Sequence, residues 1–323
     1  MRITGAKLRR SLRMRRRINS QYIVNTVKVN QMAKKNKMQK NIIKRSPSSK
    51  GLKDKDIKPL RVKHSDEWEI EEYSDIKIYQ PILIEGMPGI GNVGKVSMDI
   101  LIEELNAELL MSFHSKNFPN SVFVGEDNLV DLPKIRLYFK RIKNQDYLLL
   151  TGDAQPVTEH ASYAFSEVIL KIFKEYSGKH IVTLGGIGLN TIPENPKVYI
   201  TGNDKAFVNG MIKDFSKKKL LFESKIYGMV GPIIGISGLL LGIAKKRDVK
   251  AYCLLSETLG HPIYVGLKGS KAIIQILSRQ YGFDIDFGRL DKEIKDMDSR
   301  LSGVNTDKES LQFGKHADVN YIG

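Results

Sequence analysis

The chain has 323 residues, of which 41% are hydrophobic and 27% are charged, a composition typical of globular proteins with a sizeable core. These values exclude collagen-like chains, wholly disordered chains and small scaffolds held together by disulfides. The single cysteine, Cys253, cannot form an intramolecular disulfide, and the apolar run 251–255 around it predicts a core position. We therefore expect a reducing compartment, the cytoplasm.

The net charge of +16 is concentrated at the N-terminus. Residues 1–63 contain 21 Lys and Arg against two Asp, a net charge of +19, and residues 64–323 contain 31 Lys and Arg against 34 Asp and Glu, a net charge of −3. Because residues 1–63 lack sustained apolar periodicity, we expect a disordered basic tail that contacts RNA nonspecifically. Met32-Ala-Lys-Lys-Asn-Lys resembles a natural start, so residues 1–31 are either part of the protein or translated upstream sequence.

After residue 76, apolar runs punctuated by glycine alternate with helical patterns. The expected strands, in chain order, are 80–85, 107–113, 121–124, 135–142, 147–151, 181–184, 198–201 and 250–255. The expected helices are 93–105, 160–176, 205–215, 237–246 and 269–281. This alternation predicts an α/β three-layer sandwich with a mostly parallel mixed sheet, in a single domain that spans residues 64–302. Residues 303–323 are expected to form a flexible C-terminal tail.

Two apolar patterns need a separate interpretation. The uncharged run 226–244 is long enough for a membrane helix, but its five glycines and Pro232 favour a loop followed by a buried helix, so no membrane partner is expected. Glycines in that helix would let it approach the sheet closely. Leu290, Ile294, Met297 and Leu301 form a narrow apolar seam that packs either on its own domain or on a neighbouring subunit.

A glycine-rich loop, residues 86–95, joins a predicted strand to a predicted helix, a position typical of anion sites. Gly89, Gly91 and Gly94 fit the dinucleotide-binding turn, but no Asp or Glu ends the following strand. The loop also fits a phosphate-binding loop, except that Val96 stands where a Ser or Thr would ligate magnesium. The alternative is that these glycines serve only a tight turn and close helix packing.

Three further predicted loops, 152–156, 185–188 and 256–262, also follow strands. If the strands are parallel, all four loops meet at one sheet edge, where α/β proteins bind ligands. The candidate ligand crevice consists of Gly89, Gly91, Asn92, Gly94, Lys95, Asp153, Gln155, Gly186, Glu257 and Thr258, with His160 and His261 as further candidates. No Ser-His-Asp order, Cys-x-x-Cys pair or His-x-x-His spacing is present, so we predict no catalytic residue, metal site or cofactor.

Five ordered motifs resemble the archaeal proteasome assembly chaperone family. They are Pro88-Gly-Ile-Gly-Asn-Val-Gly94, Thr151-Gly-Asp-Ala-Gln-Pro156, Thr183-Leu-Gly-Gly-Ile187, Gly238-Leu-Leu-Leu-Gly242 and Leu254-Leu-Ser-Glu-Thr258. The resemblance implies a fold like that of purine nucleoside phosphorylases, homo-oligomerisation, and a role as a chaperone or binding partner of proteasome core-particle α subunits. Archaeal members look non-enzymatic, although some relatives have been labelled predicted ATP-dependent ligases.

The C-terminus departs from the pattern that the resemblance implies. Family members that engage proteasomes carry a terminal hydrophobic-Tyr-X motif, which enters pockets between α subunits. This chain ends Val319-Asn-Tyr-Ile-Gly323, so Tyr321 is third from the end and is followed by Ile322 and Gly323. We expect a non-enzymatic scaffold whose partner-binding tail is 321–323; the alternative is a nucleotide- or phosphate-binding enzyme of the ligase or hydrolase type using the glycine-rich loop.

Overall fold

The structure of the protein is a computed structural model that describes residues 57–64, 67–125, 128–228, 231–262 and 264–304. Its strands are β1 (Arg61–His64), β2 (Glu69–Glu72), β3 (Ile82–Glu85), β4 (Glu108–His114), β5 (Phe123–Val124), β6 (Val130–Asp131), β7 (Ile135–Ile142), β8 (Gln145–Gly152), β9 (His180–Leu189), β10 (Val198–Gly202) and β11 (Ala251–Leu259). Its α-helices are α2 (Val93–Glu104), α3 (Glu159–Glu175), α4 (Lys205–Lys217), α5 (Ile236–Lys246), α6 (Leu267–Tyr281) and α7 (Gly288–Val304).

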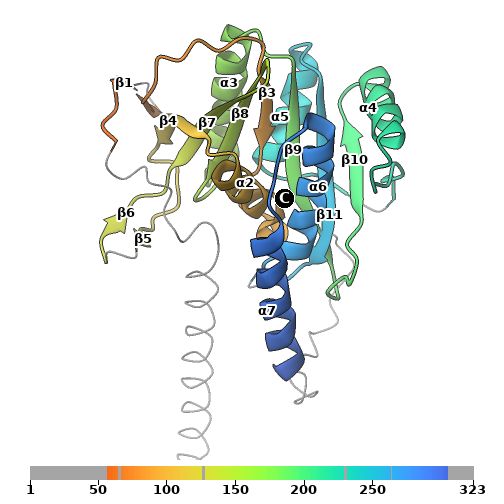
Figure 1. The fold of residues 1–323 in the computed structure, drawn as a ribbon. Coiled ribbons are helices and arrows are strands. Elements are labelled where there is room, and N and C mark those ends of the chain that lie inside the picture. Colours follow the sequence, from red (N-terminus) through yellow and green to blue (C-terminus); the bar gives the residue numbers. More distant parts are fainter. Residues whose placement is uncertain (1–56, 65–66, 126–127, 229–230, 263, 305–323) are drawn as a thin grey trace, which may run out of the picture. The chain divides into compact units, whose positions relative to one another are not determined.

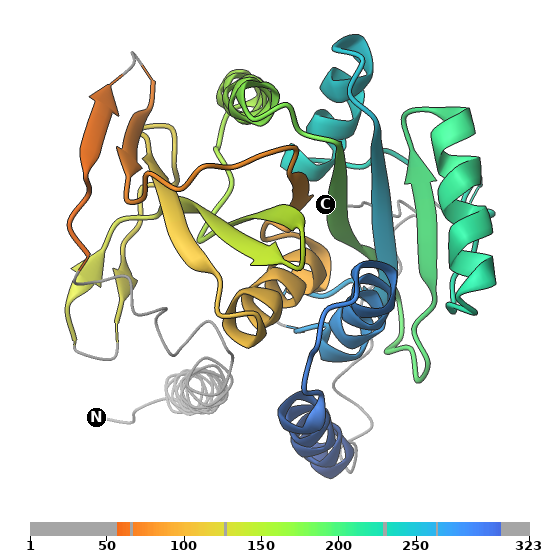
Figure 2. The same ribbon diagram turned by 45° about the horizontal axis from the view of Figure 1, so that its top comes forward.

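Nine strands form one mixed sheet in the order β1-β2-β4-β7-β8-β3-β9-β11-β10 (Figure 1). The four adjacent strands β8, β3, β9 and β11 are parallel, because helical crossovers connect them. The other pairs in this sheet are antiparallel, and the β7–β8 pair is a hairpin with a two-residue connection. The predicted α/β class with a mixed sheet is confirmed. The described sheet is not mostly parallel, however, because only the three pairs at its centre are parallel, and β1 and β10 lie at its two ends (Figure 2).

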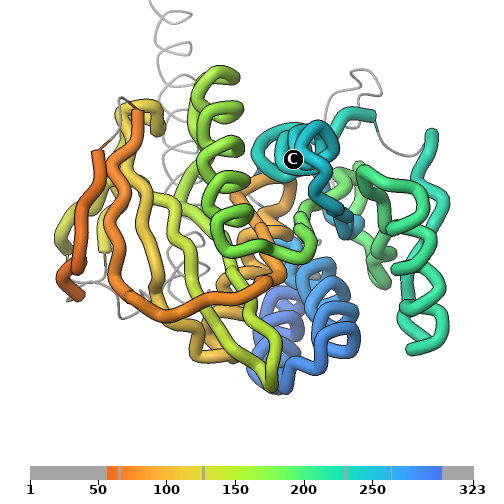
Figure 3. The backbone as a smooth tube through the Cα atoms, turned by 90° about the horizontal axis from the view of Figure 1, so that it is seen from above, coloured from red at the N-terminus to blue at the C-terminus, as the bar shows by residue number. Residues whose placement is uncertain are grey.

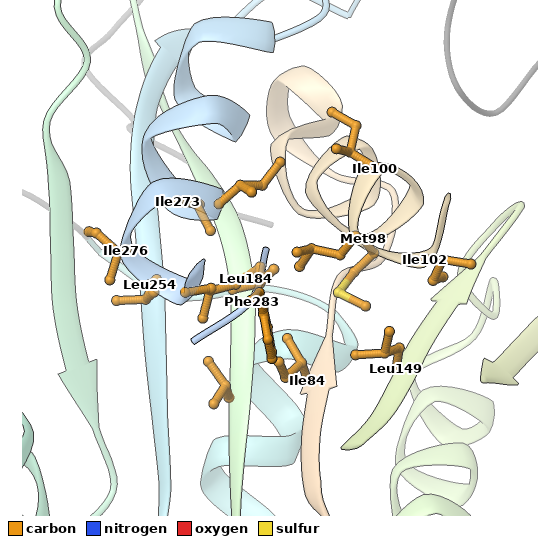
Figure 4. Packing of buried hydrophobic residues seen from close by; sticks show 14 of the residues in the cluster. Ile84, Met98, Ile100, Ile102, Leu149, Leu184, Leu254, Ile273, Ile276 and Phe283 are labelled. Carbon is orange, nitrogen blue, oxygen red and sulfur yellow. The ribbon is translucent and has the colours of Figure 1, made fainter. Parts of the chain in front are cut away.

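The sheet lies between two helical layers, which Figure 3 shows from above. Helices α3 and α5 cover one face, and α2 and α6 cover the other, each over its own apolar cluster. On the α2 side, Met98 and Ile273 meet sheet residues such as Leu184 (Figure 4). Cys253 is fully buried, as predicted, and burial raises the pKa of its thiol to about 12.

The predicted seam on α7 packs against its own domain. Leu290 is buried in the apolar cluster on the α2 side of the sheet, and Ile294 and Met297 pack against that cluster from the same helix. The run 226–244 contains α5 and the segment that precedes it. None of the helices in the described part of the chain is long and apolar enough to cross a membrane.

Two boundaries differ from the sequence prediction. Strand β1 places residues 61–63 in the sheet instead of the basic tail, because they pair with β2, and Arg61 and Lys63 form ion pairs with Glu72 of that strand. Strands β9 and β11 continue through 185–188 and 256–259, which we expected as loops, since these residues pair with one another in parallel register. Residues 1–56 and 305–323 lie outside the described residues, so the predicted tails there stay predictions.

Candidate functional site

The carboxyl ends of β8, β3, β9 and β11 meet at one edge of the sheet. This follows from their parallel pairing and confirms the expectation that the strand ends come together. The glycine-rich loop leaves β3 at this edge, passes through a short 3-10 turn, Ile90–Asn92, and enters α2. It therefore lies between the ends of its two neighbours, β8 and β9.

The loop depends on backbone conformations that favour glycine. Gly91 has φ +59° and Asn92 has φ +51°, both in the left-handed region that glycine and asparagine tolerate best. The amide of Asn92 donates to the carbonyl oxygen of Gly89 at 2.9 Å, which closes the turn. The sequence Gly-Ile-Gly-Asn thus forms the tight turn that leads the chain from strand to helix.

Three glycines allow close contacts between this loop and the neighbouring strands. A Cβ on Gly186 would lie 2.3 Å from the carbonyl oxygen of Ile90, and a Cβ on Gly94 would lie 2.5 Å from that of Leu184. A Cβ on Gly91 would lie 2.5 Å from the side-chain oxygen of Thr258. These distances are too short for any side chain, so close packing is sufficient to explain the glycine pattern.

Strand β11 and the segment before α6 close the other side of the loop. The amide of Gly266 donates to the carbonyl oxygen of Gly91 at 2.8 Å. Thr258 is buried between these two glycines, and its hydroxyl has no hydrogen-bond partner within the described part of the chain. Strand β11 and the segment before α6 therefore pack directly against this side of the loop.

Gln155 joins the glycine-rich loop to helix α5. Its side-chain amide nitrogen donates to the carbonyl oxygen of Pro88 at 2.7 Å, and its side-chain oxygen accepts from the amide of Ile236 at 2.9 Å. This second bond satisfies one of the free amides at the start of α5. Gln155 thus lies at the predicted edge, where it connects three segments of the chain.

Glu85, which the sequence analysis did not select, is fully buried directly before the loop. The hydroxyl of Ser237, in the first turn of α5, donates to one carboxyl oxygen at 3.1 Å. The other oxygen, Oε2, has no partner among the residues described. Burial raises the pKa of Glu85 to about 8, although hydrogen bonds from Ser237 and the Met87 backbone lower it. The sequence feature that could have identified Glu85 is an acidic residue at the end of the apolar run Ile-Leu-Ile.

Lys95 does not lie toward the loop as a phosphate-binding lysine would. Its ammonium group contacts both carboxylate oxygens of Asp99 at 2.6 and 2.7 Å, one helical turn further along α2. Burial raises the pKa of Asp99, and the nearby Lys95 charge lowers it. Thr151 on β8 approaches the same carboxylate at 3.5 Å. The spacing of four residues in the sequence could have identified this pair.

Replacing Lys95 with Met should lower the free energy of unfolding by about 2 kcal/mol, because the buried Asp99 carboxylate loses a charged donor. Urea denaturation at pH 7 would measure this difference. The variant Lys95→Met combined with Asp99→Leu should recover much of the loss, since no buried carboxylate is then left unpaired. An unchanged stability for Lys95→Met would show that the ion pair contributes little.

The remaining candidates have other partners. Asp153 accepts from Arg136 at 3.0 Å and from the amide of Lys134 at 3.2 Å. Glu257 lies on the opposite face of the sheet from Thr258, because adjacent strand residues alternate, and there it accepts from the hydroxyl of Tyr199 at 3.0 Å. The structure therefore brings the glycines, Thr258 and Gln155 together but directs Glu257 elsewhere.

The two histidine candidates lie in different elements. His160, in the first turn of α3, is mostly exposed and lies 3.3 Å from the Glu67 carboxylate. His261 follows the end of β11, and its carbonyl oxygen accepts from the amide of Tyr264 at 2.9 Å. Neither histidine belongs to the glycine-rich loop. The two side chains lie in different elements, so their positions do not suggest a common catalytic site.

Comparison with known proteins identifies relatives of this fold. The chain is 27% identical over 248 residues to the uncharacterized protein MJ1210 of Methanocaldococcus jannaschii, which covers 75% of this chain and 92% of that protein. Among solved structures, the Pyrococcus furiosus archaeal proteasome activator PbaB has a TM-score of 0.67 and 31% identity, and the match covers 75% of this chain and 100% of PbaB. P. furiosus PbaA, an archaeal homolog of proteasome-assembly chaperone, has a TM-score of 0.58 and 21% identity, covering 79% of this chain and 95% of PbaA.

The family comparison covers the region that carries the sheet edge. The model of the PAC2 family matches residues 83–304, from strand β3 to the end of α7. This range contains the glycine-rich loop, its strand neighbours and both helical layers. The chain therefore belongs to the PAC2 family.

Proposed function

We propose that this chain is a non-enzymatic, homo-oligomeric binding partner of proteasome core-particle subunits. The observation that carries the proposal is the similarity to PbaB, a protein described as an archaeal proteasome activator, which at 31% identity extends over the whole of that chain. Capture of purified proteasome α subunits by this chain would test it directly. Absence of capture at micromolar concentrations of both proteins would contradict it.

The contacts at the glycine-rich loop argue against a nucleotide or phosphate site there. The Lys95 ammonium contacts Asp99, and the carbonyl oxygen of Gly91 accepts from Gly266. Calorimetric titration with ATP and with phosphate is therefore expected to give no binding heat. Micromolar binding that is lost in Lys95→Ala would instead support the alternative, a nucleotide- or phosphate-binding enzyme of the ligase or hydrolase type.

The C-terminal residues Tyr321, Ile322 and Gly323 are the proposed contact with the α subunits. They lie outside the described residues, so the proposal rests on the sequence and on the family resemblance. An aromatic ring buries a large apolar area and its hydroxyl can satisfy a polar pocket, which suits an anchoring residue. Several tails in one oligomer would increase the overall affinity through avidity.

Tyr321→Ala and deletion of residues 321–323 should each weaken capture of α subunits by about tenfold or more, the effect typical of an anchoring aromatic. Surface plasmon resonance with immobilised α subunits would measure the loss. Phe313→Ala is a matched control, since it removes an aromatic ring from the same tail and should leave capture unchanged. If both terminal variants captured α subunits as well as the parent protein does, the surface that binds α subunits would have to lie on the folded domain.

A further inference from the structure

Helix α4 has a buried apolar side and an exposed basic side. Phe215 is fully buried in the apolar cluster on the α2 side of the sheet, and Phe207 and Met211 pack against that cluster from the same helix. Figure 2 shows α4 beside β10 at one end of the described sheet. At 3.6 residues per turn, the exposed residues of α4 lie on the side away from the cluster. They are Lys205, Ala206, Asn209, Gly210, Lys213, Ser216 and Lys217.

The lysines on this side of α4 are not balanced by acidic residues. Within the described part of the chain, Lys205, Lys213 and Lys217 form no ion pair. Asp214, the one acidic residue of α4, accepts from Gln280 at 2.7 Å and lies 3.5 Å from the ammonium of Lys218. A solvated helix surface typically interleaves both signs of charge, as α7 does with four basic and four acidic residues. The exposed side of α4 instead carries positive charge alone.

The positive charge continues in the segment that follows α4. Lys219 and Lys225 are exposed, and neither forms an ion pair with a described residue. The segment is fixed at the edge of the sheet, because Glu223 exchanges backbone hydrogen bonds with Val198 and Ile200 at 2.7 and 3.0 Å. The five lysines without an ion pair, here named the basic surface, are Lys205, Lys213, Lys217, Lys219 and Lys225.

Tyr227, two residues after Lys225, adds an aromatic ring to this region. Its side chain is fully exposed and is the most exposed large apolar side chain in the described part of the chain. Burial therefore gives this ring no stabilising role in the fold, and both of its faces are available for stacking. The ring lies next to positive charge in the chain, which is a combination typical of surfaces that bind single-stranded nucleic acid.

Small residues keep the basic surface open to a ligand. Ala206 and Gly210 lie between the lysines of α4, and a Cβ on Gly210 would have no described heavy atom within 4 Å apart from the helix's own backbone. A helix rises 1.5 Å per residue, so Lys205 and Lys213 are about 12 Å apart along the axis, and Lys213 and Lys217 about 6 Å. Several phosphates of one strand can therefore contact lysines on the same helix.

The chemistry of these residues favours a nucleic acid over an acidic protein. Both ligands would neutralise the lysines, but only a nucleic acid also supplies flat rings for Tyr227 to stack on. In a duplex those rings are stacked on one another, whereas in a single strand they are free to stack on an aromatic side chain. A single strand thus uses both features of the surface.

We propose that the basic surface and Tyr227 bind single-stranded nucleic acid, with the lysines on phosphates and the tyrosine ring on a base. Such binding does not depend on base sequence and weakens as the salt concentration rises. The proposal goes beyond the proposed function, whose contact with proteasome subunits is 321–323. Failure of proteasome capture would therefore leave it unaffected.

Lysine footprinting of the full chain tests the contact residue by residue. The chain is acetylated briefly with and without oligouridine RNA, and mass spectrometry measures the acetylation of each lysine. Acetylation of Lys213 and Lys217 should fall severalfold when RNA is bound. Lys171 on α3 and Lys245 on α5 are controls, since they are equally exposed and form no ion pair with described residues, and their acetylation should not change. Contacts made by N-terminal lysines are read separately, so they do not obscure the result.

Substitution of Tyr227 separates stacking from charge attraction. Tyr227→Ala should raise the RNA concentration that half-protects Lys213 by about fivefold or more, as loss of one stacked base does. Tyr227→Phe keeps the ring and should behave as the parent protein. Because the ring is exposed, neither change should affect folding.

Three outcomes would overturn the proposal. They are protection confined to lysines 1–63, equal protection of the control lysines, and an unchanged RNA requirement in Tyr227→Ala. An oligoglutamate peptide is the competing probe, and it should protect Lys213 less well than RNA of the same charge. Equal protection by the peptide would assign the basic surface to an acidic protein instead.

Discussion

Gly186→Ala is expected to lower the free energy of unfolding by about 3 kcal/mol or more, as strong overpacking does. The added Cβ would lie 2.3 Å from the carbonyl oxygen of Ile90, a backbone atom that cannot move without displacing the glycine-rich loop from β9. Urea denaturation followed by circular dichroism would measure the loss. The α/β fold itself should persist, because the apolar clusters on both faces of the sheet are unchanged.

Gly242→Ala is the matched control for this prediction. Gly242 lies on α5, and apart from the helix's own backbone and its chain neighbours no described heavy atom is within 4 Å of the position that a Cβ would take. Alanine is favoured over glycine in a helix by about 1 kcal/mol, so this variant should be slightly more stable than the parent. Equal effects of the two substitutions would mean that the loop and β9 are further apart than described.

The open position of Gly242 also corrects the expectation that glycines let α5 approach the sheet. The other glycine of that motif, Gly238, would place a Cβ 2.0 Å from the carbonyl oxygen of Ile233. Its close contact is therefore with the segment that precedes the helix. A Gly-x-x-x-Gly spacing identifies the face of a helix that lacks side chains. Which segment packs against that face depends on the tertiary structure.

The sequence was sufficient to predict the central strands and the main helices, because their burial produces a local pattern. Buried strands such as β8 contain a continuous apolar run, and α3 has an apolar stripe with helical spacing. Parallel pairing of the four central strands also follows from the alternation of strands and helices. The meeting of four strand ends at one edge was predictable for the same reason.

Strand β1 and the extensions of β9 and β11 were not predictable from local patterns. Arg61-Val-Lys-His64 is exposed at every position, and its pairing with β2, together with the ion pairs to Glu72, is visible only in the fold. Gly185 and Gly186 resemble turn residues in the sequence. They continue β9 because they pair in parallel register with Leu255 and Ser256 of β11, and Gly186 also lies too close to Ile90 for a side chain.

The residues of the candidate site also comprise some that the sequence could identify and others that it could not. Glycines that permit a turn or a close approach were identified from their spacing, and Gly91 and Gly94 lie where the sequence placed them. The role of Gln155 as a bridge, and the burial of Glu85, depend on α5, which is more than 80 residues away from Gln155 in the chain. Contacts between distant segments leave little trace in one sequence.

Glu85 and His180 should give the protein an unusual pH dependence of stability. The pKa of Glu85 is raised from 4.5 to about 8 by burial, so its stabilising contribution is fully present below pH 4.5 and is lost as the pH rises through 8. Burial, together with the Lys179 charge, lowers the pKa of His180 from 6.5 to about 4, so its contribution is present above pH 6.5 and is lost as the pH falls through 4. The two effects oppose one another between pH 4.5 and 6.5, and above pH 6.5 the Glu85 effect acts alone.

The free energy of unfolding of the parent protein should therefore fall by about 2 kcal/mol between pH 6.5 and 8, since each pH unit in this window costs about 1.4 kcal/mol when only the folded state holds the proton. Glu85→Gln should remove this decrease, because the neutral amide still accepts from Ser237 and does not ionise. Urea denaturation at several pH values would measure both slopes, with the exposed Glu194→Gln as a control that keeps the parental slope. A Glu85→Gln variant that loses stability as steeply as the parent would show that Glu85 is already ionised in the folded protein at pH 6.5, and that another group accounts for the slope.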